Sequence, residues 1–495
     1  MMAGSGRGPR ARIAAAAAVF AVVGSVAAYS ASRPAQLGSL GGVTDEYFAL
    51  GAKLRVNGTL GVARNEPSAL RPPGYPAFVA VVLAAFVESP SVLAAREFEA
   101  RGRRALYLSQ AALLAMAAVV LYLWLSGRVR GEAAAIAALV FGLNPHSLVL
   151  TGLSHYGVLH SLLLVLSCAA TDAALRSRFP ARALVGAGLL WGASNLVRPV
   201  TLLFPAFLFV VLCLWGKPVR RAALPHVLAL SLGMALALAP WTLRNYRLTG
   251  RLVAVADNPW ATLWGQTVKP LRPDPGHYVW FDLYEKDLMP IFTRVTGSPS
   301  YDYVLQNRCN AELEAEFRRE ALRNVRERPT VYLGNAAAAL WSYSVQTSAV
   351  FLTAYRELQA VRPASEPPGE SPPKAPQAWF RAGESPPALA GGLARAYAAF
   401  VLLLSVLAVG GVWSAARRRS DVVLGPLAAW VCVAATQALV FLHLMHYYSK
   451  MPFLLVGVAC LVDALVARDR WRCGWPAALG LLAACLALTV WTLSP

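Results

Sequence analysis

The stretch of the sequence with the clearest chemical potential is TDEYFALGAKLRVNGTLGVARNEPSALRPPGYPAF, residues 44–78. Asp45 and Glu46 are adjacent carboxylates, and carboxylates accept protons in general acid–base catalysis. Arg71 opens an Arg-Pro-Pro-Gly-Tyr-Pro run, and a guanidinium can grip a phosphate through two parallel hydrogen bonds. The stretch therefore combines a candidate base with a candidate anion-binding group.

Two local elements must position these groups. Residues 45–56 place Tyr47, Leu50 and Leu54 on one apolar face, which predicts a short helix on a membrane surface with Thr44 as its N-cap. The alternative interpretation is that the two acids only complement the dipole of this helix. The prolines after Arg71 predict a rigid, non-helical entry to the next apolar segment.

The composition indicates whether these elements lie in water or in a membrane. The chain has 495 residues, 57% of them hydrophobic, yet only 15% are charged, against about 25% in soluble domains. This excludes disordered, collagen-like and disulfide-scaffold proteins and disfavours a soluble globular enzyme. The seven cysteines show no metal-ligand spacing. We therefore predict an all-α polytopic membrane protein.

Apolar runs of about 20 residues mark its membrane spans. We expect about 12–13 transmembrane helices, with the run at 76–87 too short to cross and predicted to be re-entrant or interfacial. The expected spans are approximately 11–30, 104–126, 132–151, 156–175, 182–198, 199–216, 223–241, 331–352, 393–414, 422–443, 451–467 and 475–493.

The net charge of +20 bears on topology. Basic clusters fall at every second connection, as the positive-inside rule requires of cytoplasmic loops. We thus predict a single multi-pass domain, 1–495, in the cytoplasmic membrane, with 31–103 and 242–330 as outer loops. An amphipathic helix in 242–330 is predicted to lie along the membrane surface, and the Pro-rich segment 356–391 to be flexible. Between 242–330 and the basic cluster at Arg417 we count two spans where topology requires an odd number.

Taken in order, several motifs resemble those of the membrane-embedded glycosyltransferases of the C-type fold (GT-C), which include protein O-mannosyltransferases and the lipid A aminoarabinose transferase. The resemblance rests on Asp-Glu-x-Tyr, on Arg-Pro-Pro-Gly-Tyr-Pro, and on three later stretches. These are LVGAGLLWGASNLVRP (184–199), APWTLRNYRLTGRLVAVADNPWATLWGQ (239–266) and HYYSKMPFLLVGVA (446–459). The resemblance implies sugar transfer, with inversion, from a polyprenyl-phosphate donor at the outer membrane face to a lipid, glycan or protein hydroxyl.

The resemblance also implies residue roles. Asp45, with Glu46 beside it, would deprotonate the acceptor hydroxyl. The leaving phosphate gains negative charge and needs cations, for which the candidates are Arg71, Arg198, Arg244 and Lys450. Substrate contacts are assigned to Tyr75, Asn245, Trp260, Trp264 and Tyr447. The aromatic residues in this set also suit an interfacial belt.

Two positions depart from the family pattern. Ser154-His155 stands where Ser-Glu is usual, and His155 could act as base, metal ligand or hydrogen-bond donor. Lys450 stands where an arginine is usual and supplies charge without bidentate geometry. Asp45, Glu46 and His155 could together bind a divalent metal ion, but no spacing demands one. Elsewhere, pairing with Arg176 or Arg468 explains Asp172 and Asp463 better than catalysis does.

Two other functions remain as alternatives. A transporter or flippase of a lipid-linked or anionic solute would show internal repeats and ionisable residues near the midplane, and neither is visible in the sequence. A surface polysaccharide polymerase or ligase would also use polyprenyl-linked sugars. Nucleic-acid binding is not supported, because the arginines are scattered among short loops.

Overall fold

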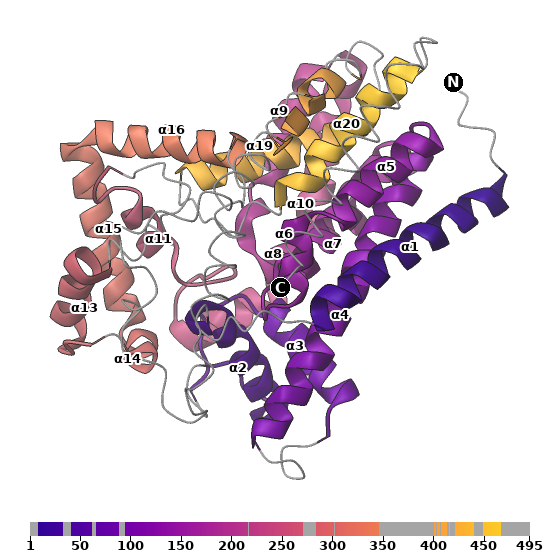
Figure 1. Cartoon of the computed structure of the whole chain (residues 1–495). Coiled ribbons are helices and arrows are strands. Elements are labelled where there is room, and N and C mark those ends of the chain that lie inside the picture. The colour runs from indigo at the N-terminus through magenta and orange to yellow at the C-terminus, as the bar shows by residue number, and fades with distance from the viewer. Residues whose placement is uncertain are drawn as a thin grey trace, which may run out of the picture.

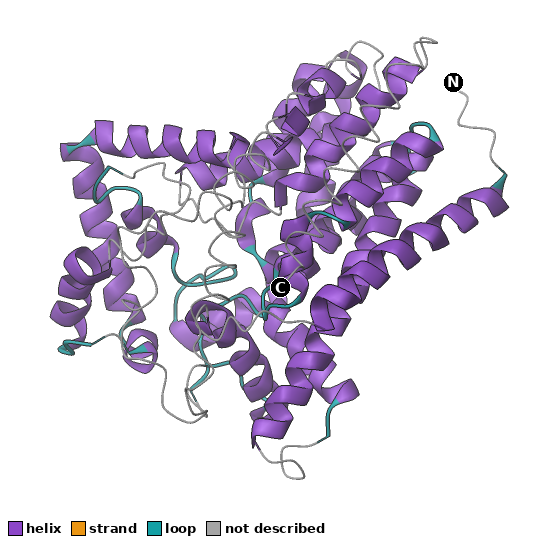
Figure 2. Ribbon diagram, viewed as in Figure 1, coloured by secondary structure: helices purple, strands orange, loops and turns teal. Residues whose placement is uncertain are grey.

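In the computed structural model, the described residues form helices joined by loops, with no strand among them (Figure 2). These are residues 8–32, 41–61, 66–88, 95–215, 217–270, 284–300, 302–345, most of 400–415, 421–439 and 449–466. The predicted loop at 356–391, the predicted span at 475–493 and the basic cluster at Arg417 lie outside them. The number of spans that separate 242–330 from that cluster therefore stays a prediction.

The helices follow the chain in the order labelled in Figure 1. They are α1 (Pro9–Ser32), α2 (Gly41–Asn57), α3 (Gly74–Phe86), α4 (Ala95–Ser126), α5 (Gly131–Gly142), α6 (Pro145–Thr151), α7 (Gly157–Leu175), α8 (Pro180–Val197), η1 (Pro199–Thr201), α9 (Phe204–Trp215), α10 (Lys217–Thr249), α11 (Pro259–Gly265), η2 (Tyr284–Leu288), α13 (Met289–Thr296), α14 (Tyr303–Arg308), α15 (Asn310–Glu327), α16 (Pro329–Val345), η4 (Asp421–Val423), α19 (Leu424–Leu439) and α20 (Met451–Val466).

Among the described helices, four are long and apolar enough to cross a membrane: α1, α4, α7 and α10. A fifth crossing arises if α5 and α6 form one span, bent by 51° where Asn144-Pro145 interrupts the helix. Asn144 explains the break, because its Oδ1 accepts hydrogen bonds from the backbone N–H groups of His146 and Ser147 and so starts a new helix. The all-α polytopic class is confirmed, whereas the count of 12–13 spans stays a prediction.

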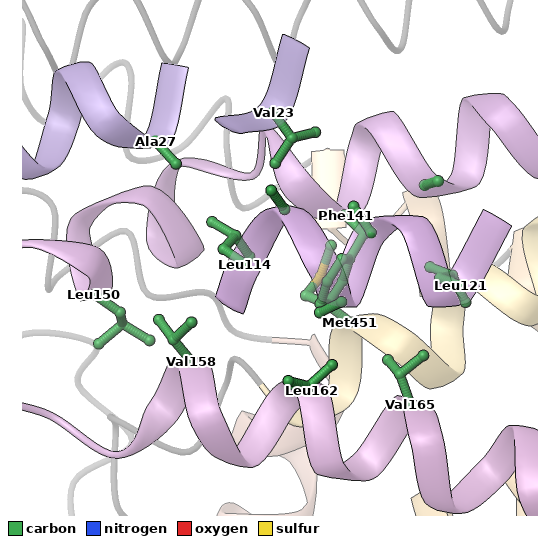
Figure 3. Close-up of a cluster of buried hydrophobic side chains, with 14 of the residues drawn as sticks. Val23, Ala27, Leu114, Leu121, Phe141, Leu150, Val158, Leu162, Val165 and Met451 are labelled. Carbon is green, nitrogen blue, oxygen red and sulfur yellow. The ribbon is translucent and has the colours of Figure 1, made fainter. Parts of the chain in front are cut away.

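The core of the bundle is built from α1, α4, α5, α6, α7 and α20 (Figure 3). Val23 of α1, Leu114 of α4, Phe141 of α5 and Val165 of α7 are almost completely buried in it. A second cluster joins α8, α9 and α10 to α19. There α8 and α10 pack backbone to backbone, since a Cβ built at Gly188 would lie only 2.1 Å from the carbonyl oxygen of Leu230. Small residues permit such close packing of membrane helices.

The bundle has two chemically different ends. At the basic end, Arg12 at the start of α1 donates to Ser126 at the end of α4, and Asp172 pairs with Arg128 and Arg176. The predicted Asp172–Arg176 pair is thus confirmed, and basic residues from the start of α1 and from two connections, α4–α5 and α7–α8, lie at one end. Asp463 accepts a hydrogen bond from the backbone of Arg130, and its predicted partner, Arg468, lies outside the described residues.

The predicted outer loop 242–330 contains a small helical unit, formed by α11, α13, α14 and α15 on one side of the molecule (Figure 1). We call it the outer unit. Its core contains Trp264, Phe292, Leu313 and Phe317. The amphipathic helix predicted to lie on the membrane surface is α15, and its position at a membrane stays a prediction. Its apolar face packs on α11 and α13, because the same loop supplies the partner helices.

Candidate functional site

The acidic pair lies early in α2. The helix begins at Gly41, so Thr44 lies inside it and is not the predicted N-cap. The carboxylate of Glu46 accepts two hydrogen bonds from Arg71, from Nε at 2.8 Å and from Nη2 at 3.0 Å. This bidentate pair is partly open to solvent, with 14% of the Glu46 side chain and 27% of the Arg71 side chain exposed. The Asp45 side chain lies outside the described part of the structure.

Three tyrosines pack next to this ion pair. The ring centroids of Tyr47 and Tyr75 are 5.7 Å apart, and those of Tyr47 and Tyr156 are 5.4 Å apart, both with edge-to-face geometry. The Tyr75 hydroxyl donates to Oε1 of Gln110 at 3.0 Å. Gln110 in turn donates to the backbone carbonyls of Thr151 and Leu153. The three tyrosines therefore join α2, α3 and the α6–α7 connection into one rigid cluster.

This packing bears on the substrate contact predicted for Tyr75, which stays a prediction. Its side chain is fully buried and its hydroxyl is bonded to Gln110. A substrate contact through this side chain would break a buried hydrogen bond, which costs about 1–3 kcal/mol. Tyr75 is accordingly part of the frame of the site.

Arg198 reaches the same cluster from the end of α8. Its guanidinium carbon lies 5.2 Å from the ring centroid of Tyr156, within the range of a cation–π contact. Burial raises the pKa values of Tyr47 and Tyr156, and the positive charges of Arg198 and Arg71 oppose that rise at both phenols. Two of the four predicted phosphate-binding cations thus converge on one tyrosine cluster, although α8 ends more than 120 residues after Arg71.

A third arginine at this site, Arg103, was not predicted. It lies near the start of α4, where it donates to Ser154 Oγ at 3.3 Å and to Glu99 at 2.7 Å. Its guanidinium also lies 4.7 Å from the ring centroid of Phe48 in α2. The signal available in the sequence was the basic run Arg-Gly-Arg-Arg at 101–104, which sits on the predicted outer flank and so opposes the positive-inside bias.

His155 lies beside Tyr156, with ring centroids 4.0 Å apart. Its side chain is buried, and its Nδ1 accepts a hydrogen bond from the backbone N–H of Gly157 at 3.1 Å. A nitrogen that accepts from a backbone amide is unprotonated, so the proton of the neutral ring is on Nε2. The Nδ1 lone pair is thus engaged in this structure. Which of the three predicted roles His155 has stays a prediction.

Metal binding by the acidic pair and His155 stays a prediction. Within the described residues, no group of three or more His, Cys, Asp or Glu side chains is arranged to hold a metal ion. Glu46 is engaged by Arg71, and the carboxylate of Asp45 is not among the described side chains.

The roles predicted for Arg244 and Asn245 are not supported. Arg244 donates to the backbone carbonyl of Ser68 at 2.7 Å and to that of Leu60 at 3.4 Å. Asn245 is buried, and its side-chain amide donates to the carbonyls of Val253 and Val255. Both side chains hold backbone segments together, because α10 continues to Thr249 and carries them into the contact between the two outer loops.

The remaining predicted residues lie apart from the tyrosine cluster. Lys450 is buried and donates to the carbonyl oxygen of Tyr343 in α16 at 2.8 Å, so phosphate binding by its ammonium stays a prediction. Trp264 is 1% exposed in the core of the outer unit, and its predicted contact with a sugar stays a prediction. Trp260 is half-buried, with the Arg318 guanidinium 5.3 Å from its ring. Tyr447 lies outside the described residues.

Comparison with known proteins gave similarities to solved structures. No family model matches the chain, and no curated protein matches it. The archaeal oligosaccharyltransferase AglB from Archaeoglobus fulgidus, in complex with an inhibitory peptide and a dolichol-phosphate, is 14% identical, with a TM-score of 0.49 over 97% of this chain and 55% of that one. ArnT from Cupriavidus metallidurans, bound to undecaprenyl phosphate, is 14% identical, with a TM-score of 0.40 over 90% of this chain and 77% of that one.

A third similar structure is the S. cerevisiae protein O-mannosyltransferase complex bound to the sugar donor. It is 14% identical, with a TM-score of 0.37 over 48% of this chain and 34% of that one. All three are GT-C glycosyltransferases, the class that the sequence motifs resemble. The chain spans about half of the oligosaccharyltransferase and about a third of the mannosyltransferase chain.

Proposed function

We propose that this chain is a membrane-embedded glycosyltransferase that moves a sugar from a polyprenyl-phosphate donor to an acceptor hydroxyl. One observation carries the proposal: Arg71 and Arg198 converge with the acidic turn of α2 on the tyrosine cluster at one end of the bundle. Two cations beside a candidate base at the water–lipid boundary suit a reaction in which a lipid phosphate leaves.

The proposed chemistry is a single displacement. The acceptor oxygen attacks the anomeric carbon, and its bond to that carbon forms as the bond from the carbon to the phosphate oxygen breaks. The acceptor proton passes to the carboxylate of Asp45. The electron pair of the broken bond goes to the polyprenyl phosphate, whose increased negative charge is stabilised by Arg71 and Arg198. Attack from the side opposite the leaving group inverts the anomeric carbon.

Glu46 and Asp45 have different roles in this scheme. Both of its oxygens accept hydrogen bonds from Arg71, so it orients the guanidinium and holds α2 to the segment before α3. Asp45 is the proposed base, one residue earlier in the same helix. Arg103 adds positive charge on the other side of the cluster, at Ser154.

The orientation of the chain follows from the same placement. Arg12, Arg128 and Arg176 lie at the end of the bundle opposite the tyrosine cluster. If that basic end is cytoplasmic, as the positive-inside rule requires, the proposed site opens on the outer face of the cytoplasmic membrane. The lipid tail of the donor would then lie among the spans, and the acceptor would be a lipid, glycan or protein hydroxyl.

The test compares Asp45→Asn with wild-type protein, purified and supplied with radiolabelled polyprenyl-phosphate sugars and a crude envelope fraction as acceptor. Loss of a general base lowers turnover by about 10²–10⁴-fold. Glu97→Gln is the matched control, because Glu97 is an exposed carboxylate paired with Arg101 on the surface of α4. Full turnover in Asp45→Asn would exclude Asp45 as base. Movement of the intact donor across vesicles without sugar transfer by wild-type protein would favour the transporter alternative.

A further inference from the structure

The segment that leads to Arg71 is held by the other outer loop. Its backbone first folds on itself, since the Ser68 N–H donates to the Leu60 carbonyl at 2.9 Å. Arg244, at the end of α10, then donates to the carbonyls of both Ser68 and Leu60. At the surface, Arg308 of α14 pairs with Glu66.

The contact nearest to Arg71 is made by Asp257. Its backbone N–H donates to the carbonyl of Ala69 at 2.9 Å, two residues before Arg71. The carbonyls of Ser68 and Ala69 are thus both hydrogen-bonded to residues that precede the outer unit, Arg244 and Asp257. Prolines at 72 and 73 further restrict the backbone on the other side of Arg71.

Asp257 is itself fixed by α15. The side-chain amide of Asn310 donates at 2.8 Å to both the backbone carbonyl and Oδ2 of Asp257, and Arg251 pairs with the same carboxylate. One turn further along α15, Glu314 accepts hydrogen bonds from the backbone N–H groups of Trp260 and Ala261 at the start of α11. The side chains of Asp257, Asn310 and Glu314 are buried.

We propose that the outer unit is a brace for the proposed donor-phosphate site, and that Asn310 and Arg244 are positioning residues within it. Asn310 holds Asp257, Asp257 and Arg244 hold residues 68–69, and these residues set the place of Arg71 and of its partner Glu46. The assignment of Arg71 to a phosphate rests on the proposed function, whereas the mechanical connection rests on the contacts alone. Displacement of a reacting group by about 1 Å can lower turnover by about 10²-fold.

The experiment measures amide hydrogen exchange in the full chain, in detergent or nanodiscs, for wild type, Asn310→Ala and Asn324→Ala. Asn324 is a matched control: it is a buried asparagine of the same helix, but its amide donates to Thr267 Oγ1, at the far end of α11. We expect exchange in residues 66–71 to rise by at least about tenfold in Asn310→Ala and to stay at the wild-type rate in Asn324→Ala. Arg244→Ala supplies a second variant, which removes the hydrogen bonds to the carbonyls of Ser68 and Leu60 and should raise the same rates.

Two outcomes would overturn the brace: unchanged exchange in residues 66–71 for a folded Asn310→Ala or Arg244→Ala variant, or an equal rise in Asn324→Ala. A second readout is turnover, which should fall by about 10–100-fold in Asn310→Ala and remain near wild type in Asn324→Ala. Failure of the proposed function is distinguishable, because wild-type protein would then transfer no sugar while the exchange rates would still report the mechanical connection.

Discussion

Ion pairs at the two ends of the bundle share the same chemistry but differ in access to solvent. At the basic end, the Asp172 side chain is 1% exposed and is surrounded by Arg128, Arg176 and the indole N–H of Trp124. At the other end, Glu46 and Arg71 form an equally well-aligned pair that is 14% and 27% exposed.

The difference separates a structural role from a functional one. Removing a carboxylate from water is costly, and the two arginines and the indole that enclose Asp172 offset that cost, so loss of one member of the pair is destabilising. A half-open pair is worth little to stability, yet a ligand can reach its guanidinium. Substitutions at the two ends should therefore divide between loss of turnover and loss of stability.

The largest expected effect is on turnover at the open pair. Arg71→Ala should lower sugar transfer by about 10²–10³-fold, as removal of a group that stabilises transition-state charge does, while changing the free energy of unfolding by only about 1 kcal/mol. Arg71→Lys should recover part of the turnover, because it restores charge without the bidentate geometry. Turnover assays and thermal unfolding on the same preparations check this, and equal loss in both would contradict the distinction.

The enclosed pair should behave in the opposite way. Asp172→Ala leaves two arginines without their carboxylate and should lower the free energy of unfolding by about 3–5 kcal/mol, with turnover per folded molecule near wild type. Asp463→Asn is a suitable comparison, because Asp463 contacts the more exposed Arg130 at 4.0 Å and should cost about 1 kcal/mol. If Asp172→Ala lowers the free energy of unfolding no more than Asp463→Asn does, burial of the ion pair does not determine its contribution to stability.

A pH-dependent effect is expected in the outer unit. Burial raises the pKa of the Glu314 carboxyl from 4.5 to about 7, Asp257 adds to the rise, and the N–H groups of Trp260 and Ala261 oppose it. Between pH 4.5 and about pH 7, the folded unit therefore binds more protons than the unfolded chain does. Its stability is greatest below about pH 4.5 and falls by at most about 3 kcal/mol as the pH rises through 7.

Exchange of the α11 amides, corrected for the intrinsic dependence on pH, measures this stability. Glu314→Gln should remove the slope, because its side chain carries no titratable proton. A slope that persists in Glu314→Gln would assign the effect to another group.

The smallest effect concerns helix packing in the bundle. Gly188→Ala would place a Cβ 2.1 Å from the Leu230 carbonyl oxygen and should cost about 1–3 kcal/mol through overpacking. Gly186 lies in the same helix, and a Cβ there meets nothing within 4 Å, so Gly186→Ala should be neutral or stabilising by about 0.4–1 kcal/mol. Melting temperatures of the two variants test this expectation. An equal fall in melting temperature in Gly186→Ala and Gly188→Ala would contradict the close packing of α8 on α10.

Part of the site could be predicted because its signals are local. The helical pattern after Asp45 and the rigid run after Arg71 each depend on neighbouring residues, and the structure shows the corresponding elements. The buried surroundings of Tyr75, Asn245 and Trp264 could not be predicted, for the opposite reason. Whether an aromatic or amide side chain faces a substrate or a core depends on segments distant in the chain.

The sequence by itself determined that this is an all-helical membrane protein, because apolar runs without alternative partners must satisfy their backbone hydrogen bonds internally. It also determined where the charges could lie, since connections between spans follow the positive-inside bias. Only the tertiary structure decided which charges meet. It paired Glu46 with Arg71, brought Arg198 and Arg103 to the same cluster, and turned Arg244 to the backbone of the first loop, because such contacts join residues up to 184 positions apart.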